Sequence, residues 1–211
     1  MSGDDYQGKQ YGSEIRTIFF DVGGVLLIDF IDDKIVDIAR KYDRDPKRLL
    51  AARKEYRTLA DKGHISDREF WEAIFKTAAI SPTQEDREVD SYMEEIEGVR
   101  DIAEKLKRRS YHLAILSNDS REMFMKRRQR FALDRLFENI ILSSEHGFIK
   151  PYPEIYRVAL EITKTPPEKA LLIDDRQENI KTAQELGMQG ILFLNAAQLR
   201  EELYRSGIDF P

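Results

Sequence analysis

The sequence contains no cysteine, and this absence excludes disulfide bonds, thiol catalysis and thiolate metal sites. It also lacks an apolar run long enough to span a membrane. The polar residues 1–13 have neither the basic start nor the apolar core of a signal peptide. Basic residues are in the minority, because 34 lysines and arginines face 39 aspartates and glutamates and leave a net charge of −5. We therefore expect a cytoplasmic protein whose partners are neither nucleic acid nor membranes.

The length and composition predict a globular protein with a well-solvated surface. A chain of 211 residues can hold one ordinary domain with a modest insertion. Charged residues make up 35% of the chain and hydrophobic residues 41%, which is typical of a folded protein in water.

The run Thr17–Ile28 is the stretch around which the chain is organised. Its β-branched and aromatic start predicts a strand buried on both faces, as in the middle of a parallel sheet. Asp21 then lies at the carboxyl end of that strand, where open α/β sheets place their ligand sites. Gly23 and Gly24 allow a sharp turn and a close approach of backbone amides to an anion. The alternative is an ordinary strand and turn followed by an acidic residue.

A helical segment without strands is expected between residues 32 and 96. Ser66 and Glu69 form a capping-box pattern, and the aromatic stripe that follows them is interpreted as the core of a small helical bundle. The predicted helices are Asp32–Tyr42, Pro46–Asp61, Ser66–Ala79 and Thr83–Ile96. This pattern predicts an inserted helical domain at 31–97.

Beyond Gly98 helices and strands alternate, which predicts a parallel sheet with right-handed crossovers. The expected strands are His112–Leu116, Asn139–Leu142, Ala170–Ile173 and Ile191–Leu194, and the expected helices are Val99–Arg109, Arg121–Arg130, Pro153–Ile162, Arg176–Leu186 and Ala197–Arg205. The fold class is therefore α/β, with a three-layer, Rossmann-like sheet core made of residues 14–30 and 98–211 and an inserted α-helical domain.

Polar residues follow four of the strands and should meet at one edge of the sheet. They are Asp21, the segment Ser117-Asn118-Asp119, the segment from Ser143 to Pro151, and Asp174-Asp175. Asp21 and Asp175 can jointly hold Mg²⁺, which favours carboxylates together with waters and phosphate oxygens. Ser117 and Lys150 can donate to phosphoryl oxygens, and Asn179 lies one helical turn beyond Asp175, where it can steady the metal carboxylate.

Four motifs in this order resemble those of the phosphatase-type haloacid dehalogenase (HAD) superfamily. They read Phe-Phe-Asp-Val-Gly-Gly-Val-Leu from Phe19, Leu-Ala-Ile-Leu-Ser-Asn from Leu113, Gly-Phe-Ile-Lys-Pro-Tyr-Pro-Glu-Ile-Tyr from Gly147, and Leu-Leu-Ile-Asp-Asp-Arg-Gln-Glu-Asn-Ile from Leu171. Each is weak alone, but together they span nearly the whole chain. The resemblance also accounts for the helical insertion as a mobile cap that is entered just after the first motif.

The resemblance implies a magnesium-dependent phosphatase that acts through an aspartyl-phosphate intermediate. Asp21 would be the nucleophile, and Lys150 and Ser117 would assist it. The phosphate would be bound by Gly23, Gly24, Ser117, Asn118 and Lys150, and Mg²⁺ by Asp21, Gly23 (through its carbonyl), Asp175 and, from the outer shell, Asp174. The expected substrate is a small phosphorylated metabolite such as a sugar phosphate, and the expected state is a monomer or weak homodimer.

The sequence departs from the family pattern at Gly23, where phosphatases of this superfamily usually carry a second aspartate. Glycine can still offer its carbonyl to a metal, but it cannot protonate the leaving oxygen, and such acid–base help is worth about 10²–10⁴ in rate. A similar glycine occurs in a branch that resembles sugar-1-phosphate phosphatases. The candidates to replace the acid are Asp29, Asp119, Glu145 and His146.

Two other functions stay open. A degenerate phosphatase would bind a phosphorylated ligand or partner without turnover, and Gly23 is the reason to consider it. A 2-haloacid dehalogenase would use the same nucleophile on carbon without a metal, but the pair Asp174-Asp175 argues against it. The cap selects the substrate in this superfamily, and periodicity alone does not say which of Tyr56, Arg57 and Lys62 face the pocket.

Overall fold

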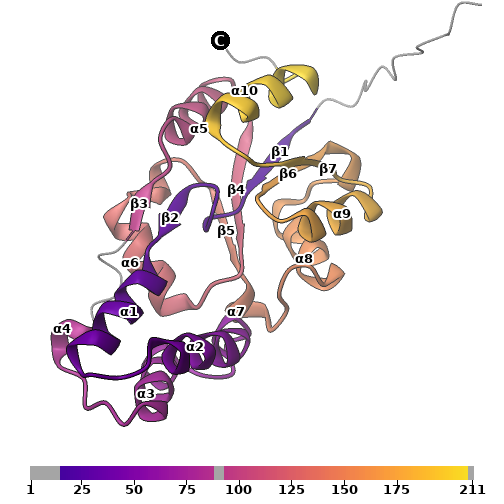
Figure 1. The fold of residues 1–211 in the computed structure, drawn as a ribbon. Coiled ribbons are helices and arrows are strands. Elements are labelled where there is room, and N and C mark those ends of the chain that lie inside the picture. The colour runs from indigo at the N-terminus through magenta and orange to yellow at the C-terminus, as the bar shows by residue number, and fades with distance from the viewer. Residues whose placement is uncertain (1–14, 88–92, 209–211) are drawn as a thin grey trace, which may run out of the picture.

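A parallel sheet forms the centre of the molecule in the computed structural model, which describes residues 15–87 and 93–208 (Figure 1). Within these ranges its order is β5-β4-β1-β6-β7, and every neighbouring pair is parallel. The strands are β1 (Thr17–Phe20), β4 (His112–Ser117), β5 (Asn139–Leu142), β6 (Ala170–Asp174) and β7 (Gln189–Leu192). The first strand of the chain is thus the central one, and its carboxyl end places Asp21 in the middle of the sheet edge.

Helices cover both faces of this sheet and give the three layers expected from the sequence. The side chains of Ile18 and Phe20 lie on one face of the sheet, where they share a core with the apolar sides of α5 (Val99–Arg108) and α10 (Ala196–Arg205). Phe19 points to the other face and packs with α8 (Pro153–Thr163) and α9 (Gln177–Glu185). The remaining core elements are α6 (Arg121–Arg130), α7 (Ser143–His146) and two 3₁₀ helices at Leu133–Arg135 and Pro167–Lys169. Because β1 is buried on both faces, it holds Asp21 rigidly.

The inserted helices lie beyond the carboxyl ends of the strands (Figure 1). They are α1 (Ile31–Lys41), α2 (Pro46–Asp61), α3 (Asp67–Thr77) and the short α4 (Gln84–Arg87). The expected capping box is present, because Ser66 and Glu69 bond each other's backbone at the start of α3. Inside the bundle, the ring of Trp71 packs edge to face against Phe70, with 5.0 Å between the ring centroids. It also stacks on Phe75, with 6.1 Å between the centroids. These aromatic side chains form the core of the cap.

The expectation of no strand between residues 32 and 96 is wrong. A strand β3 (Met93–Glu95) pairs antiparallel with β2 (Leu27–Asp29) where the chain leaves and re-enters the core. The predicted helix Thr83–Ile96 is observed only as α4, and residues 88–92 of that prediction lie outside the described residues. The pattern of β3 misled the prediction because a three-residue strand with one buried side chain, Met93, shows no alternation, and two glutamates favour a helix.

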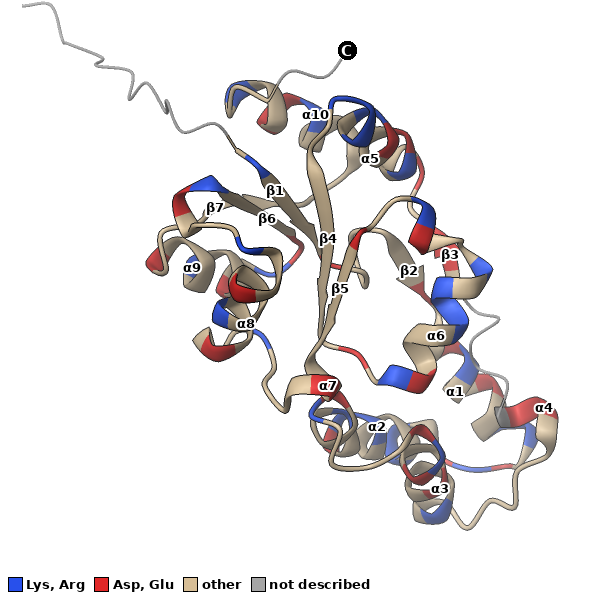
Figure 2. Cartoon of the chain, turned by 180° about the vertical axis from the view of Figure 1, so that it is seen from behind, with Lys and Arg blue, Asp and Glu red and all other residues tan. Residues whose placement is uncertain are grey.

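Charged residues of both signs are spread over the helices. Figure 2 shows lysines and arginines next to aspartates and glutamates along α5 and along the cap helices. Several of them pair at helical spacing, as Arg68 does with Glu72 at 2.8 Å. None of the described helices combines the length and the apolar character that crossing a membrane requires.

Candidate active site

Asp21, Lys150 and Asp174 form a buried ionic cluster at the carboxyl edge of the sheet. Asp21 follows β1, Asp174 ends β6, and Lys150 comes from the segment after α7. Lys150 Nζ lies 3.0 Å from Asp21 Oδ1 and donates to Asp174 Oδ2 at 2.6 Å. Three segments that are far apart in the sequence therefore meet within hydrogen-bond distance.

Burial controls the charges of this cluster. Burial raises the pKa of Asp21 to about 6, and the nearby ammonium of Lys150 opposes that rise. Burial alone would lower the pKa of Lys150, but Asp21 and Asp174 together raise it above its usual value. One buried cation thus faces two carboxyl groups, and the site is short of positive charge.

Asp174 is held by its own set of donors. Its Oδ1 accepts from the backbone N–H of Arg176 at 2.9 Å and from Nδ2 of Asn179 at 2.8 Å, while Oδ2 accepts from Lys150. Asn179 is buried at the start of α9, as its spacing from Asp175 suggested, although it contacts Asp174 rather than Asp175. Asp174 therefore accepts three hydrogen bonds, whereas Asp175 is exposed and has its carboxylate available.

The donor set fits a divalent cation of the magnesium type. Within the described part of the chain, carboxylate oxygens of Asp21, Asp174 and Asp175 lie within 4.8 Å of one another. Burial and the neighbouring Asp174 raise the pKa of Asp175. A bound cation would lower that pKa again. Hard oxygen ligands with one side open to a cavity are what Mg²⁺ takes when it also binds a phosphate.

Gly24 leaves room for Asp175. Its φ is +79°, and a Cβ added there would lie 2.4 Å from Asp175 Oδ2. We expect Gly24→Ala to weaken Mg²⁺ binding at least tenfold, because Asp175 must move, and to lower the free energy of unfolding by about 1 kcal/mol through backbone strain. Isothermal titration with Mg²⁺ and thermal melting measure the two effects.

Gly207→Ala is the matched control for that variant. Gly207 has a similar φ of +73°, but a Cβ there meets nothing within 4 Å. It should therefore show the strain alone and leave Mg²⁺ binding unchanged. Equal Mg²⁺ affinity in the two variants would contradict the role given to Gly24.

Ser117 and Asn118 end β4 beside the ionic cluster. The Asn118 side chain is a clamp for the Lys150 backbone, since Oδ1 accepts from Lys150 N at 2.7 Å and Nδ2 donates to Lys150 O at 2.8 Å. Ser117 is buried and lines the cavity described next. Phosphate binding by these two residues stays a prediction, but the structure gives Asn118 a positioning contact that the motif did not reveal.

A cavity of about 430 Å³ lies between the sheet edge and the cap. Most of the residues predicted for the site line it: Asp21, Gly23, Gly24, Ser117, Asn118, Lys150 and Asp175. Asp174 lies behind them, buried. Sequence reasoning missed Ile28, Asp61, Arg127 and Arg176, which also line the cavity, and no pattern marked them.

The structure also places the cap residues and the candidate replacement acids. Arg57 lines the cavity, whereas Lys62 lies outside it with Nζ 5.7 Å from the centroid of the Tyr152 ring. Of the four acid candidates, Asp29 lines the cavity. The others lie elsewhere: Asp119 is buried against Arg127, Glu145 lies 3.6 Å from Arg121, and His146 ends α7.

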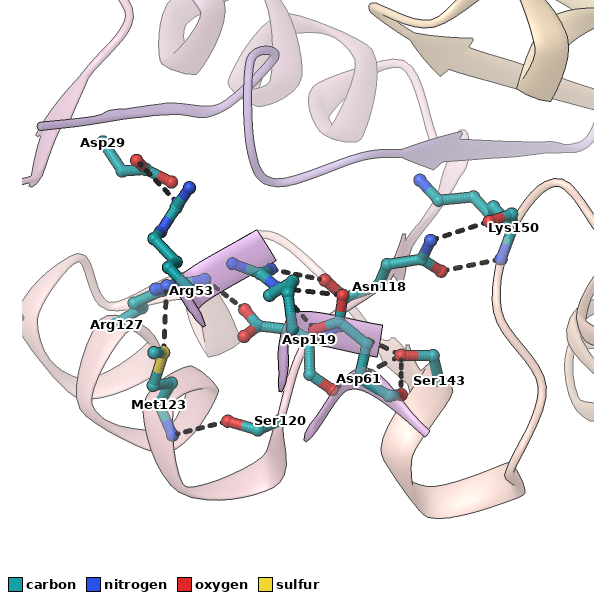
Figure 3. A network of polar contacts seen from close by, with 11 residues as sticks. Asp29, Arg53, Asp61, Asn118, Asp119, Ser120, Met123, Arg127, Ser143 and Lys150 are labelled. Carbon is teal, nitrogen blue, oxygen red and sulfur yellow. Dashed lines mark hydrogen bonds and ion pairs between the residues drawn. The ribbon is translucent and has the colours of Figure 1, made fainter. Parts of the chain in front are cut away.

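A polar network joins the cap to the core on one side of the cavity (Figure 3). Arg57 Nε donates to both carboxylate oxygens of Asp61, at 2.7 and 2.8 Å, and Arg57 Nη2 donates to the carbonyl of Asn118 at 3.1 Å. Ser143 Oγ donates to the carbonyl of Asp61 at 2.5 Å and accepts from Asp119 N at 3.0 Å. The end of α2 is thus fastened to two loops of the core.

The architecture and the site identify the family. A model of the haloacid dehalogenase-like hydrolases matches residues 15–187. The chain belongs to this family. It is therefore a hydrolase of the HAD superfamily with an α/β core and a helical cap, as the four motifs predicted.

Comparison with individual proteins adds detail. Glyceraldehyde 3-phosphate phosphatase of Pyrococcus furiosus is 30% identical over 104 residues, which are 49% of this chain and 43% of that protein, so the match spans less than half of the relative. The structure of a HAD family enzyme from Bacteroides thetaiotaomicron has a TM-score of 0.72 at 24% identity and covers 91% of this chain and 99% of that one. The same enzyme is also known in complex with magnesium and inorganic phosphate, with a TM-score of 0.68 at 23% identity, covering 86% and 95% of the two chains. The structure of L-2-haloacid dehalogenase from Xanthobacter autotrophicus has a TM-score of 0.64 at 18% identity, and the match covers 92% of this chain and 84% of that one. At these identities the structural likeness establishes the fold alone.

Proposed function

We propose that this protein is a magnesium-dependent phosphatase that hydrolyses the phosphomonoester of a small metabolite such as a sugar phosphate. The observation that carries the proposal is the meeting of Asp21, Lys150 and the pair Asp174-Asp175 at one end of the cavity. This arrangement offers a nucleophile, a cation for the phosphoryl group and a metal site within a few ångströms of one another. The relatives support it, since one is a phosphatase and a structural neighbour binds magnesium and inorganic phosphate.

Mg²⁺ would be held by Asp21, Asp175 and the carbonyl of Gly23, with Asp174 in its outer shell. When bound, it neutralises phosphoryl oxygens and keeps the pKa of the adjacent carboxyl groups low. Asp21 is positioned by β1 and by the backbone N–H of Val22, which donates to Oδ1 at 2.7 Å. Its second oxygen is thereby left to act on phosphorus.

The residues of this chain have separate roles in phosphoryl transfer. Asp21 attacks phosphorus and forms an aspartyl phosphate while the bond from phosphorus to the leaving oxygen breaks. Water later attacks that phosphorus, and its bond to Asp21 breaks, which restores the carboxylate and releases inorganic phosphate. Lys150, fixed by Asp174 and by the Asn118 clamp, stabilises the negative charge on the equatorial oxygens. Ser117 donates a further hydrogen bond. The cap lines one side of the cavity through Arg57 and Asp61, where it would limit entry of water.

Chelation of the metal should abolish turnover. We expect hydrolysis of p-nitrophenyl phosphate and of members of a sugar-phosphate panel to fall by at least about 10³-fold with EDTA, because the carboxylates then repel the substrate and the metal no longer neutralises the phosphoryl oxygens. Activity should return on addition of excess Mg²⁺. Phosphate release measures both results.

The other outcomes of this assay decide between functions. Binding of inorganic phosphate without turnover of any ester would indicate the degenerate phosphatase for which Gly23 is the argument. Metal-independent release of halide from 2-chloropropionate would indicate a dehalogenase. Light scattering checks the expected monomer or weak homodimer.

A further inference from the structure

The proposed reaction lacks a proton donor for the leaving group at the usual position. Gly23 has no side chain, and a Cβ added to it would meet nothing within 4 Å. No described side chain therefore fills the space beside Gly23. The donor, if the enzyme has one, must reach the cavity from another direction.

Two carboxyl groups line the cavity besides those assigned to the nucleophile and the metal site, at Asp29 and Asp61. Asp29 lies on β2, is exposed to solvent and faces Arg53 at 3.8 Å. Asp61 lies at the end of α2, in the cap, and only 8% of its surface is exposed. The two differ in solvation, and a buried carboxyl group is the one whose proton affinity the protein can tune.

The position of Asp61 is fixed by the core although the residue belongs to the cap. Arg57 binds its carboxylate and at the same time the carbonyl of Asn118, the residue after Ser117. Ser143 binds its main-chain carbonyl. Figure 3 shows Asp61 in this network together with Asn118 and Asp119. The carboxyl group is therefore held beside the carboxyl end of β4, on the cap side of the same cavity that Asp21 lines.

We propose that Asp61 is the general acid and base of this enzyme and takes over the function for which Gly23 has no side chain. The proposal rests on the phosphatase function above. In the first step, Asp21 forms a bond to phosphorus, the bond from phosphorus to the leaving oxygen breaks, and the proton of the Asp61 carboxyl group moves to that oxygen to give an alcohol. In the second step, Asp61 takes a proton from water, the water oxygen bonds to phosphorus, and the bond to Asp21 breaks, which releases inorganic phosphate.

The charges around Asp61 suit this role. Burial raises its pKa to about 6, Arg57 and Arg127 lower it, and the carboxylate of Asp119 raises it. A substrate phosphate dianion entering the cavity would raise it further, so that the proton is present when the substrate is bound. A group that gives up and regains a proton near neutral pH is what acid–base catalysis requires.

The test compares two aryl esters whose leaving groups differ in basicity, p-nitrophenyl phosphate and phenyl phosphate, with Mg²⁺ present. We expect Asp61→Asn to lower kcat/KM for phenyl phosphate by about 10²-fold or more, because its leaving group needs the proton, and to lower it far less for p-nitrophenyl phosphate. Asparagine can still accept a hydrogen bond from Arg57, and unchanged binding of inorganic phosphate would verify an intact site. A variant with equal losses on both esters, or with none, overturns the proposal.

Two further variants sharpen the test. Gly23→Asp should restore phenyl phosphate hydrolysis in the Asp61→Asn background, because the added carboxyl group meets open space at the usual position of the acid. Asp29→Asn removes the competing carboxyl group of the same cavity. If Asp29→Asn, rather than Asp61→Asn, gives the leaving-group-dependent loss, Asp29 is the acid and the proposal is wrong.

The pH profile of the unmodified enzyme tests the same point without a variant. The acid must be protonated, so kcat/KM for phenyl phosphate should fall as pH rises above the pKa of Asp61. The value of kcat/KM for p-nitrophenyl phosphate should not show this decrease. Identical profiles for the two esters overturn the proposal. Absence of turnover of either ester would instead contradict the phosphatase function on which it rests.

Discussion

We expect Asp21→Asn to abolish the proposed Mg²⁺-dependent phosphatase activity and to leave the fold intact. We expect kcat to fall by about 10⁴-fold or more, because loss of a nucleophile removes the covalent route altogether. Asparagine has nearly the same shape as aspartate and can still accept the hydrogen bond from Val22 and the contact from Lys150. Release of phosphate from p-nitrophenyl phosphate measures the loss, and circular dichroism checks the fold.

Asp37→Asn is the matched control for this variant. Asp37 lies on α1 and pairs only at the surface with Arg40, at 3.1 Å, with most of its side chain exposed. The same chemical change there should leave kcat unchanged. A residual kcat in Asp21→Asn near that of the control would contradict the assignment of the nucleophile.

Lys150→Met removes the one cation of the buried cluster and should be the most destabilising single change at the site. Asp21 and Asp174 would then face each other in a buried setting without a countercharge, at a cost of about 3–5 kcal/mol. The loss depends on pH in a definite direction. Without Lys150, burial and the nearby Asp174 raise the pKa of Asp21 in the folded state without opposition, so the variant is most destabilised at high pH and regains stability as Asp21 is protonated.

Urea unfolding in EDTA at pH 5 and pH 8 measures this dependence. The difference in the free energy of unfolding between the parent protein and Lys150→Met should be larger at pH 8 than at pH 5. Lys181→Met, at a largely exposed position on α9, is the control and should change stability little at either pH. A loss that does not vary with pH would show that packing, rather than charge, accounts for the effect of Lys150.

The sequence allowed prediction of the sheet and of the part of the site that depends on it. Asp21, Ser117, Lys150 and Asp175 follow strands that are recognisable as short apolar runs, and parallel strands bring their carboxyl ends to one edge. Their convergence therefore follows from the topology alone. The roles assigned to them are still predictions, which the variants above test.

The cap side of the cavity was not predictable in the same way. Periodicity identifies the apolar side of α2, but Arg57 and Asp61 lie on its polar side, and only the docking of the cap on the core decides which polar residue faces the cavity. Arg127 falls in a run of basic residues from 126 to 130, a pattern that usually indicates a solvated helix face, yet it is buried against Asp119. Such contacts depend on tertiary packing, which a local pattern does not contain.

The place of β1 in the sheet has a consequence for how the molecule assembles. Thr17 is aligned with His112 on one side and Ala170 on the other, so the earliest strand to be synthesised has no neighbour until much later segments are available. The cap helices, by contrast, are contiguous in the chain and can pack against one another first. A growing polypeptide thus carries an unpaired, strongly apolar ribbon, Ile18-Phe19-Phe20, through most of its synthesis, and aggregation during translation should begin there rather than in the cap.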